Sequence, residues 1–242
     1  MSNLARFALC GLLLVGCDAP SRVSQTHTFA SEQPITEIRA DVEHGAVTVI
    51  AADVSRAEVI RDVQWYGRGE PRAEMWTAGG VLHIDFKCRS DHPLCHADHT
   101  IRAPASVRVA VTVGRGDVEI EGTHGDVDVE AGSGDIELHQ VSGDLSLKTG
   151  AGEVDGTDLR SATADVETGA GEVDLYFSGE IARVEIFAGA GDIDLEVPAG
   201  AYQLDIAADA GDVDVEDVSH DSGAEGVIIV DSSAGDVDIE GR

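Results

Sequence analysis

The chain has 242 residues, with 46 Asp and Glu against 16 Lys and Arg, which gives a formal net charge of −30. So large an acidic excess argues against nucleic-acid binding, which needs basic patches, and against adhesion to bare anionic lipid. The charge is uneven: up to Arg115 there are 13 acidic and 12 basic residues, and from Gly116 onward there are 33 and 4. Halophilic adaptation would spread acidic residues over every surface, so the excess belongs to the second half of the chain.

Residues 1–16 are predicted to be a signal peptide. Arg6 supplies a short positive start, and Phe7 to Val15 is an apolar run too short to span a bilayer. The run ends in Leu14-Val15-Gly16-Cys17, which resembles the lipobox of bacterial lipoproteins. This resemblance implies cleavage before Cys17, lipidation of Cys17, and a protein anchored to a membrane of the bacterial cell envelope on its periplasmic or surface face. The alternative is an ordinary secretory signal with a chance cysteine.

Residues 17–31 are predicted to be a lipidated, flexible tether. The segment is polar and contains Pro20 and several Ser and Thr residues, a composition typical of linkers. Roughly 210 residues follow it, enough for one or two packed cores. We therefore expect a soluble domain held at the membrane by its lipid.

Residues 32–106 are predicted to form an N-terminal β cap and the first coils of a stacked fold. Apolar alternation at 35–42, 45–49, 57–65 and 81–86 predicts strands. Both tryptophans of the chain lie in this part. A stack of coils needs its open end covered, which is the role expected for this segment.

Two cysteines remain once the signal peptide and Cys17 are set aside. Cys88 and Cys95 form an even pair in an oxidising compartment, which predicts a disulfide. The alternative is a zinc site that also uses His92, His96 and His99. The gap of six residues between the cysteines is wider than the usual two to four of zinc sites, which favours the disulfide.

Residues 107–242 carry a repeated Gly-Asp-Val-Asp-Val motif. With small variations it begins at Gly116, Gly125, Gly134, Gly143, Gly152, Gly171, Gly191, Gly211 and Gly235. Apolar and charged residues alternate strictly, as in strands with one buried face, and the density of Gly and β-branched residues excludes helix. Stacked in register, the repeats predict an all-β fold, a parallel β-solenoid of about seven coils of about 18 to 20 residues each. Antiparallel hairpins forming a sandwich are the structural alternative.

The order of these parts resembles the bacterial "putative adhesin" family, a domain of unknown function found on exported envelope proteins. The resemblance runs from about Ile35 to Arg242. The residues that show the resemblance are Gly45-Ala46-Val47-Thr48-Val49, the Val107-Arg108-Val109 strand and the Gly-Asp-Val strands after it. The family name implies adhesion without identifying a ligand, and the resemblance transfers no catalytic residues.

In-register stacking predicts two columns of carboxylates on the outside of the solenoid. The first comprises Asp117, Asp135, Glu153, Glu172, Asp192, Asp212 and Asp236, and the second Glu119, Glu137, Asp155, Asp174, Asp194, Asp214 and Asp238. Carboxylates about 4.8 Å apart on neighbouring strands repel by roughly 1 kcal/mol in water, so we expect raised pKa values in the columns, recruitment of cations, or both. The alternative is that the first column hydrogen-bonds corner amides and the second is a solvated face.

The candidate cation surface comprises Asp192, Asp194, Asp212, Asp214, Asp236 and Asp238. Only weak, delocalised divalent cation binding is expected there, with no dedicated metal site and no other cofactor. In calcium-binding nonapeptide solenoids the acid lies two residues before the apolar position. Here each acid directly precedes an apolar residue, as in Asp192-Ile193, so a calcium cage is not expected.

The function predicted from these patterns is binding rather than catalysis. The carboxylate pairs look alike in every coil, whereas a catalytic pair has distinctive surroundings. The chain stops at Arg242, soon after Ile239, which predicts an open terminal coil that pairs with a partner or a second copy. We expect a lipid-anchored envelope protein whose acidic solenoid is an adhesin-like or structural surface for an envelope protein or wall polymer. The alternative is a carbohydrate-active β-helix enzyme that acts on envelope polysaccharide.

Overall fold

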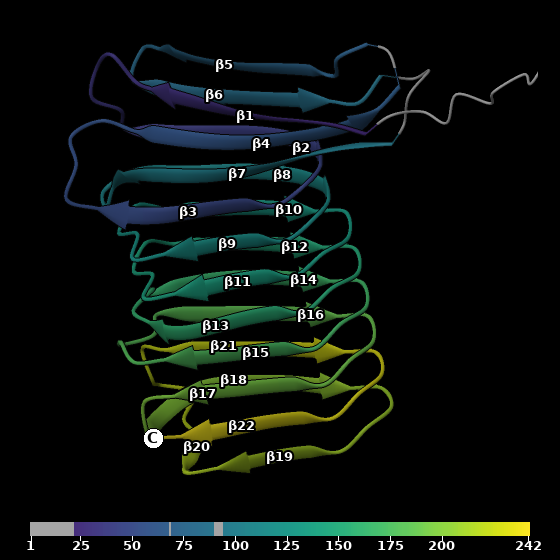
Figure 1. The fold of residues 1–242 in the computed structure, drawn as a ribbon. Coiled ribbons are helices and arrows are strands. Elements are labelled where there is room, and N and C mark those ends of the chain that lie inside the picture. Colours follow the sequence, from purple (N-terminus) through teal and green to yellow (C-terminus); the bar gives the residue numbers. More distant parts are fainter. Residues whose placement is uncertain (1–21, 68, 90–93) are drawn as a thin grey trace, which may run out of the picture.

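The computed structural model describes residues 22–67, 69–89 and 94–242, which form strands and turns in two sheets (Figure 1). The sheets face each other along the whole stack and contain 11 strands each. Within these ranges no helix is long and apolar enough to cross a membrane. The expected signal peptide and Cys17 lie outside the described residues.

The first sheet carries the acidic strands. In spatial order it contains β1 (Arg22–Ala30), β4 (Glu58–Tyr66), β7 (Cys95–Pro104), β3 (Val47–Ala52), β9 (Val118–Glu121), β11 (Ile136–His139), β13 (Val154–Leu159), β15 (Val173–Phe177), β17 (Ile193–Val197), β22 (Val237–Gly241) and β19 (Val213–Glu216). The chain therefore begins at one end of this sheet and returns to it once in every coil.

The second sheet lies behind the first. Its order is β20 (Val218–His220), β18 (Gly200–Ala208), β21 (Val227–Ser232), β16 (Arg183–Ala188), β14 (Thr163–Thr168), β12 (Leu145–Thr149), β10 (Val127–Ala131), β8 (Arg108–Arg115), β2 (Glu37–His44), β6 (Val81–Lys87) and β5 (Arg72–Ala78). Seven coils run from β8 to β22, each with one strand in each sheet.

Neighbouring coils pair as parallel strands in register. Ile136 lies opposite Val118 on one side and Val154 on the other, and all three side chains are buried. The alternation seen in the sequence therefore places every second side chain in a continuous core between the sheets. This arrangement confirms the parallel solenoid and excludes the antiparallel sandwich.

The corners that precede the acidic strands need glycine. Gly134 has a φ of 130°, and a Cβ atom there would lie 2.2 Å from the carbonyl oxygen of Gly116 in the preceding coil. Gly152 repeats this arrangement, with a φ of 147° and 2.1 Å to the carbonyl oxygen of Gly134. Residues with a side chain rarely adopt this φ, and the space leaves no room for one.

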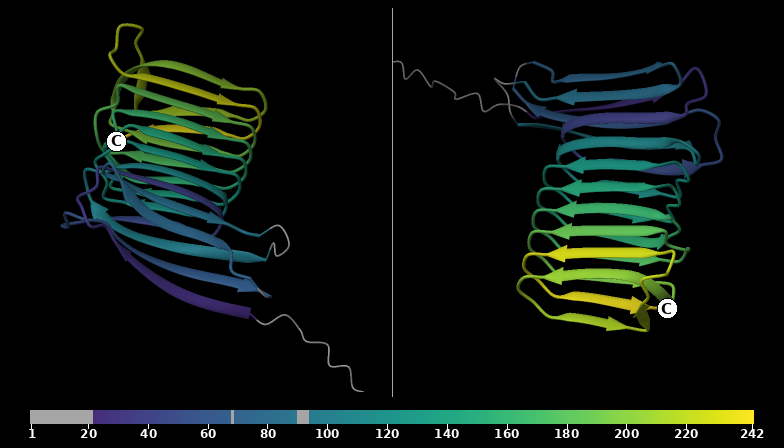
Figure 2. Two further views of the ribbon diagram at one scale, coloured as in Figure 1. Left: turned by 90° about the horizontal axis from the view of Figure 1, so that it is seen from above. Right: turned by 180° about the vertical axis from the view of Figure 1, so that it is seen from behind.

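The last two coils stack in the reverse of their chain order. β21 pairs with β16 on one side and β18 on the other, and β22 pairs with β17 and β19 (Figure 2). The prediction of an open terminal coil at Ile239 is therefore wrong, because β18 to β20 form that end of the stack. Composition explains the order: Ile228 and Val230 of β21 are buried between two neighbours, whereas the more polar β18 takes the end, where Leu204 and Ile206 stay half-buried.

The N-terminal strands form the predicted cap. β1 pairs antiparallel with β4, β4 with β7, and β5 with β6. The prediction of a flexible tether over residues 17–31 is wrong from Arg22 onward, because β1 is paired along its whole length and packs Val23 and Phe29 against the core. Its polar composition suits an edge strand, which leaves most side chains in water.

Cys88 and Cys95 form a disulfide, as predicted, with their Cα atoms 5.8 Å apart. The bond joins the segment after β6 to the start of β7 and so ties the second sheet to the first at the cap. A zinc site on these two thiols is excluded by this pairing, because a disulfide sulfur is no thiolate ligand. His92 of that hypothesis lies outside the described residues.

Candidate functional site

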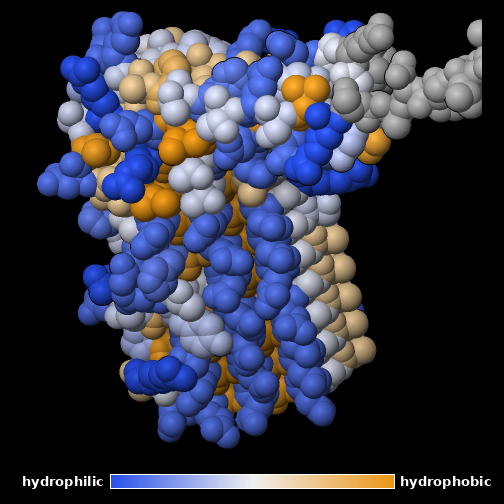
Figure 3. Space-filling model, in the orientation of Figure 1, coloured by the Kyte–Doolittle hydropathy of each residue, from blue (hydrophilic) through white to orange (hydrophobic). Residues whose placement is uncertain are grey.

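The outer face of the first sheet presents the predicted columns of carboxylates. Glu137 lies opposite Glu119 and Asp155, and Asp174 lies opposite Asp155 and Asp194. Asp238 comes next, between Asp194 and Asp214, because the last coil of the chain (β21 and β22) is inserted between the two coils that precede it. We call this set the strand column: Glu119, Glu137, Asp155, Asp174, Asp194, Asp238 and Asp214. Figure 3 shows the resulting hydrophilic stripes running along the stack, with hydrophobic lines between them.

The other predicted set, the corner column, has a structural role at four steps. Backbone amides donate to the carboxylate of the neighbouring coil: Asp135 N to Asp117 at 3.1 Å, Glu153 N to Asp135 at 2.9 Å, Asp236 N to Asp192 at 2.9 Å, and Asp212 N to Asp236 at 2.8 Å. Such bonds join each coil to the next and occupy one oxygen atom of each accepting carboxylate. Asp192 and Asp236 of the candidate cation surface therefore act in this ladder, as the alternative interpretation predicts.

Burial and mutual repulsion together raise the pKa of several carboxylates in the strand column. Burial, and then the charges of Glu119 and Asp155, raise the pKa of Glu137 above its ordinary value. Burial and Asp194 likewise raise the pKa of Asp174, and burial, Asp194 and Asp214 raise that of Asp238. Carboxylates in this position favour any partner that brings positive charge.

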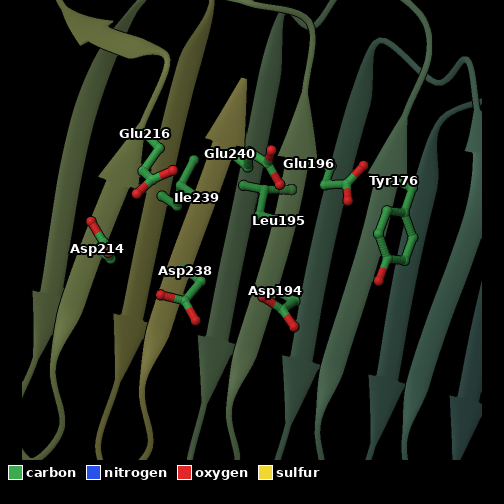
Figure 4. Close-up of a pocket in the computed structure, with 9 residues that line it drawn as sticks. All are labelled: Tyr176, Asp194, Leu195, Glu196, Asp214, Glu216, Asp238, Ile239 and Glu240. Carbon is green, nitrogen blue, oxygen red and sulfur yellow. The ribbon is translucent and has the colours of Figure 1, made fainter. Parts of the chain in front are cut away.

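A third row of outward side chains turns one part of this face into a groove. Glu196 lies opposite Tyr176 and Glu240, and Glu240 lies opposite Glu216. Together with the strand column these residues line a hollow of about 400 Å³, which we call the acidic groove: Tyr176, Asp194, Leu195, Glu196, Asp214, Glu216, Asp238, Ile239 and Glu240. Six carboxylates from three adjacent coils point into it, in two rows, with Tyr176 at one side (Figure 4).

The acidic groove already holds one intramolecular cation at its rim. Arg242 Nη2 forms an ion pair with Glu196, whose side chain is largely buried. The guanidinium shows how a cationic group is accepted here: carboxylates of adjacent coils offer oxygen atoms at the repeat distance of the sheet, about 4.8 Å. Hard divalent cations, lysine or arginine side chains and amino groups on polymers share the required chemistry.

Three of the six carboxylates in the acidic groove were predicted from the sequence. Asp194, Asp214 and Asp238 were predicted and do lie together, whereas Asp192, Asp212 and Asp236 lie in the corner column. Glu196, Glu216, Glu240 and Tyr176 were missed. Their signal was present, since each lies two residues beyond a member of the strand column and so faces the same way.

One carboxylate cluster lies further along the same face. Ligand atoms of Glu153, Glu172 and Asp174 lie within 4.8 Å of one another. All three are exposed or half-exposed, so the cluster resembles the acidic groove in character and extends its charge along the stack.

Comparisons with known proteins agree with this architecture. The model of the family described as Toastrack DUF4097 matches residues 104–240, more than half of the chain. A solved structure named as a putative adhesin from Parabacteroides merdae ATCC 43184 has a TM-score of 0.50 at 10% identity, covering 88% of this chain and 95% of that one. A putative adhesin from Parabacteroides distasonis ATCC 8503 has a TM-score of 0.49 at 14% identity, covering 92% and 97%. No curated protein matches the sequence.

Proposed function

Because the chain belongs to the toastrack DUF4097 family, we propose that it is a lipid-anchored envelope protein that binds cationic partners through its acidic groove. Adhesion, the role that the names of its structural relatives suggest, is then charge-based contact with basic proteins, amino-bearing wall polymers or cation-bridged surfaces. The observation that supports this proposal is the groove itself, in which six carboxylates from three coils converge on one outward face.

The position of Cys17 supports an orientation for this binding. Four residues separate Cys17 from β1, and five Cα steps of extended chain span at most about 17 Å. A lipid on Cys17 would therefore keep the N-terminal end of the stack close to the membrane. The acidic groove lies near the other end of the stack, on β17, β22 and β19 (Figure 1). Anionic lipid repels that end, so the groove would point away from the membrane.

Charge neutralisation within the groove tests the proposal. The triple variant Asp194→Asn, Glu196→Gln, Asp238→Asn removes three of its charges with little change in shape. A matched control, Asp128→Asn, Glu130→Gln, Asp165→Asn, removes three exposed charges from the outer face of the second sheet. We expect calorimetry with polylysine and with calcium to show at least tenfold weaker binding for the groove variant and little change for the control. Equal losses in both variants would show binding to the overall charge and refute the groove as a site.

Membrane anchoring is tested separately. In cells, radiolabelled palmitate should be incorporated into the wild-type chain and not into a Cys17→Ser variant, which should also leave the membrane fraction. Label in the variant would contradict lipidation at Cys17 and leave the groove proposal untouched.

The competing hypothesis of a carbohydrate-active enzyme finds less support in the groove. Its carboxylates occupy equivalent positions in successive coils, whereas general acid and base residues need different surroundings. Tyr176 is the one aromatic residue among the lining residues, which offers a small platform for a sugar ring. Release of soluble sugar from envelope polysaccharide by the wild type and not by the groove variant would establish the enzyme instead.

A further inference from the structure

Three basic side chains form a row on the inner face of the cap. His27 of β1 lies directly opposite Arg61 of β4, and Arg61 lies directly opposite His99 of β7. On β4 and β7 the residues two positions before and after this row, such as Val59 and Val63, are buried in the core, so Arg61 and His99 face inward, whereas His27 on the edge strand is exposed. We call His27, Arg61 and His99 the basic row.

The two inner members of the row are buried with little hydrogen bonding, and the ring of His99 packs edge-on against Phe86. Arg61 is 6% exposed and His99 is 1% exposed. Neither Nε nor Nη1 of Arg61, nor either ring nitrogen of His99, has a hydrogen-bond partner among the described residues. Burial lowers the pKa of Arg61, and burial together with the charge of Arg61 lowers the pKa of His99 to about 4. A buried cation with unused donors is stable only if an anion compensates it.

The carboxylates on the same strands are used elsewhere. Asp62 accepts a hydrogen bond from the Thr26 hydroxyl on the opposite, outer face of the sheet. Asp98 accepts the backbone amide of Ala46 at 3.0 Å. Because the alternation of the strands turns both side chains away from the core, neither Asp62 nor Asp98 faces Arg61.

Among the described residues, no strand lies beyond β1 and β5 at the N-terminal end of the stack. β1 and β5 are the edge strands of the two sheets, and both lie at the N-terminal end (Figure 2). Between them lies a hollow of about 480 Å³ lined by Phe29, Met75, Thr77 and Glu32 among others. Phe29 is the next residue after His27 on the same side of β1, so the hollow adjoins the His27 end of the basic row, whose three residues are not themselves among its lining. The Thr77 hydroxyl in its wall is also buried without a partner.

We propose that the N-terminal end of the solenoid binds an anionic amphiphile, with its carboxylate or phosphate on the basic row and its apolar chain in the adjoining hollow. The planar guanidinium matches the two oxygens of such a head group. The half-buried side chains of Val23, Phe29, Ala73 and Met75 provide the apolar contact for a chain. The volume of the hollow lies in the range of small-molecule sites.

The test uses the chain from Asp18 onward, which retains every described residue and carries no lipid. Octanoate supplies the head and chain together, acetate the head alone, and octanol the chain alone. Octanoate should raise the melting temperature saturably and shift the ring signals of His99 in NMR spectra, whereas acetate and octanol should do so at least tenfold more weakly. Equal responses to octanol and octanoate would overturn the proposal, because they would leave no role for the basic row.

Variants separate the basic row from general charge. Arg61→Met should weaken octanoate binding at least tenfold. Arg61→Lys keeps the positive charge but not the paired donors of the planar guanidinium, so it should weaken binding less. The control Arg39→Met removes an exposed arginine of the outer face, paired with Glu37, and should bind as the wild type does. Unchanged binding by Arg61→Met would refute the site. If Arg61→Met does not fold, Arg61→Lys and the His99 signals of the wild type decide the question.

Vesicles identify the source of the head group. Binding to phosphatidylglycerol vesicles that depends on Arg61 indicates a membrane lipid as the ligand. Octanoate binding without Arg61-dependent vesicle binding indicates a free fatty acid. Failure of both probes would contradict the proposal and would not affect the acidic groove, which lies at the opposite end.

Discussion

Replacing a corner glycine tests how closely the coils approach one another. In Gly134→Ala, the new Cβ would lie 2.2 Å from the Gly116 carbonyl oxygen, far inside van der Waals contact, at a φ of 130°. Backbone conformations of this kind cost roughly 1–3 kcal/mol for residues with a side chain. Relief of the clash requires the corner to move against both neighbouring coils, so we expect a total loss of about 3 kcal/mol or more.

A second glycine isolates the contribution of the backbone angle. Gly79 has a φ of 62°, and a Cβ there would meet nothing within 4 Å. Gly79→Ala should therefore cost only about 1 kcal/mol, the strain of the left-handed conformation alone. Urea denaturation followed by circular dichroism measures both variants. If Gly134→Ala were no less stable than Gly79→Ala, the corners would not be in contact and the close stacking of the coils would be refuted.

Two further predictions concern pH. The pKa of Asp174 is raised in the folded state, so its ionisation destabilises the fold, and the stability present below its unfolded pKa is lost as pH rises. Asp174→Asn should therefore stabilise the protein at pH 7 by up to about 0.5 kcal/mol and have no effect near pH 3; destabilisation at pH 7 in urea titrations would contradict this. The pKa of His99 is instead lowered, to about 4, so the stability that its neutral form contributes above pH 6.5 is lost as pH falls. The loss approaches about 3 kcal/mol below pH 4. His99→Leu should remove that part of the pH dependence, and an unchanged profile would show that His99 is not buried.

Strand positions and core residues followed from the sequence because a period of two is a direct consequence of strand geometry. In Ile193-Asp194-Leu195, for example, the alternation places the two apolar residues in the core and Asp194 in water, as the structure has them. The columns followed from the repeat length, since equal coils bring equal positions into register. These features depend only on local pattern, which a sequence displays in full.

The order of the last coils could not be predicted in this way. Leu204 and Ile206 of β18 occupy the same register as Ile228 and Val230 of β21, so either coil fits on β16. Which coil pairs with β16 depends on how much apolar surface each whole coil buries, and local alternation does not show this. It decides the composition of the acidic groove, because the inserted coil contributes Asp238 and Glu240 to its centre.

Two features of the cap, strand β1 and the basic row, could not be predicted from local sequence either. In β1 the inward positions include Gln25 and His27, so the alternation of an edge strand is weak. The basic row joins residues from three strands that are distant in the chain. Only the pairing of β1, β4 and β7 brings them together, and no local spacing indicates it.

The acidic groove exists as described only if Asp238 lies between Asp194 and Asp214. Paired cysteine substitutions measure this most directly, because a disulfide cannot form when Cα atoms are more than about 7 Å apart. Asp194→Cys with Asp238→Cys places the two cysteines on adjacent strands, with Cα atoms about 4.8 Å apart. Asp194→Cys with Asp214→Cys places them two strands apart, with Cα atoms at roughly 10 Å. Mass spectrometry after mild oxidation should find a new disulfide in the first pair and free thiols in the second. A disulfide in the second pair and none in the first would show coils stacked in chain order and contradict the groove.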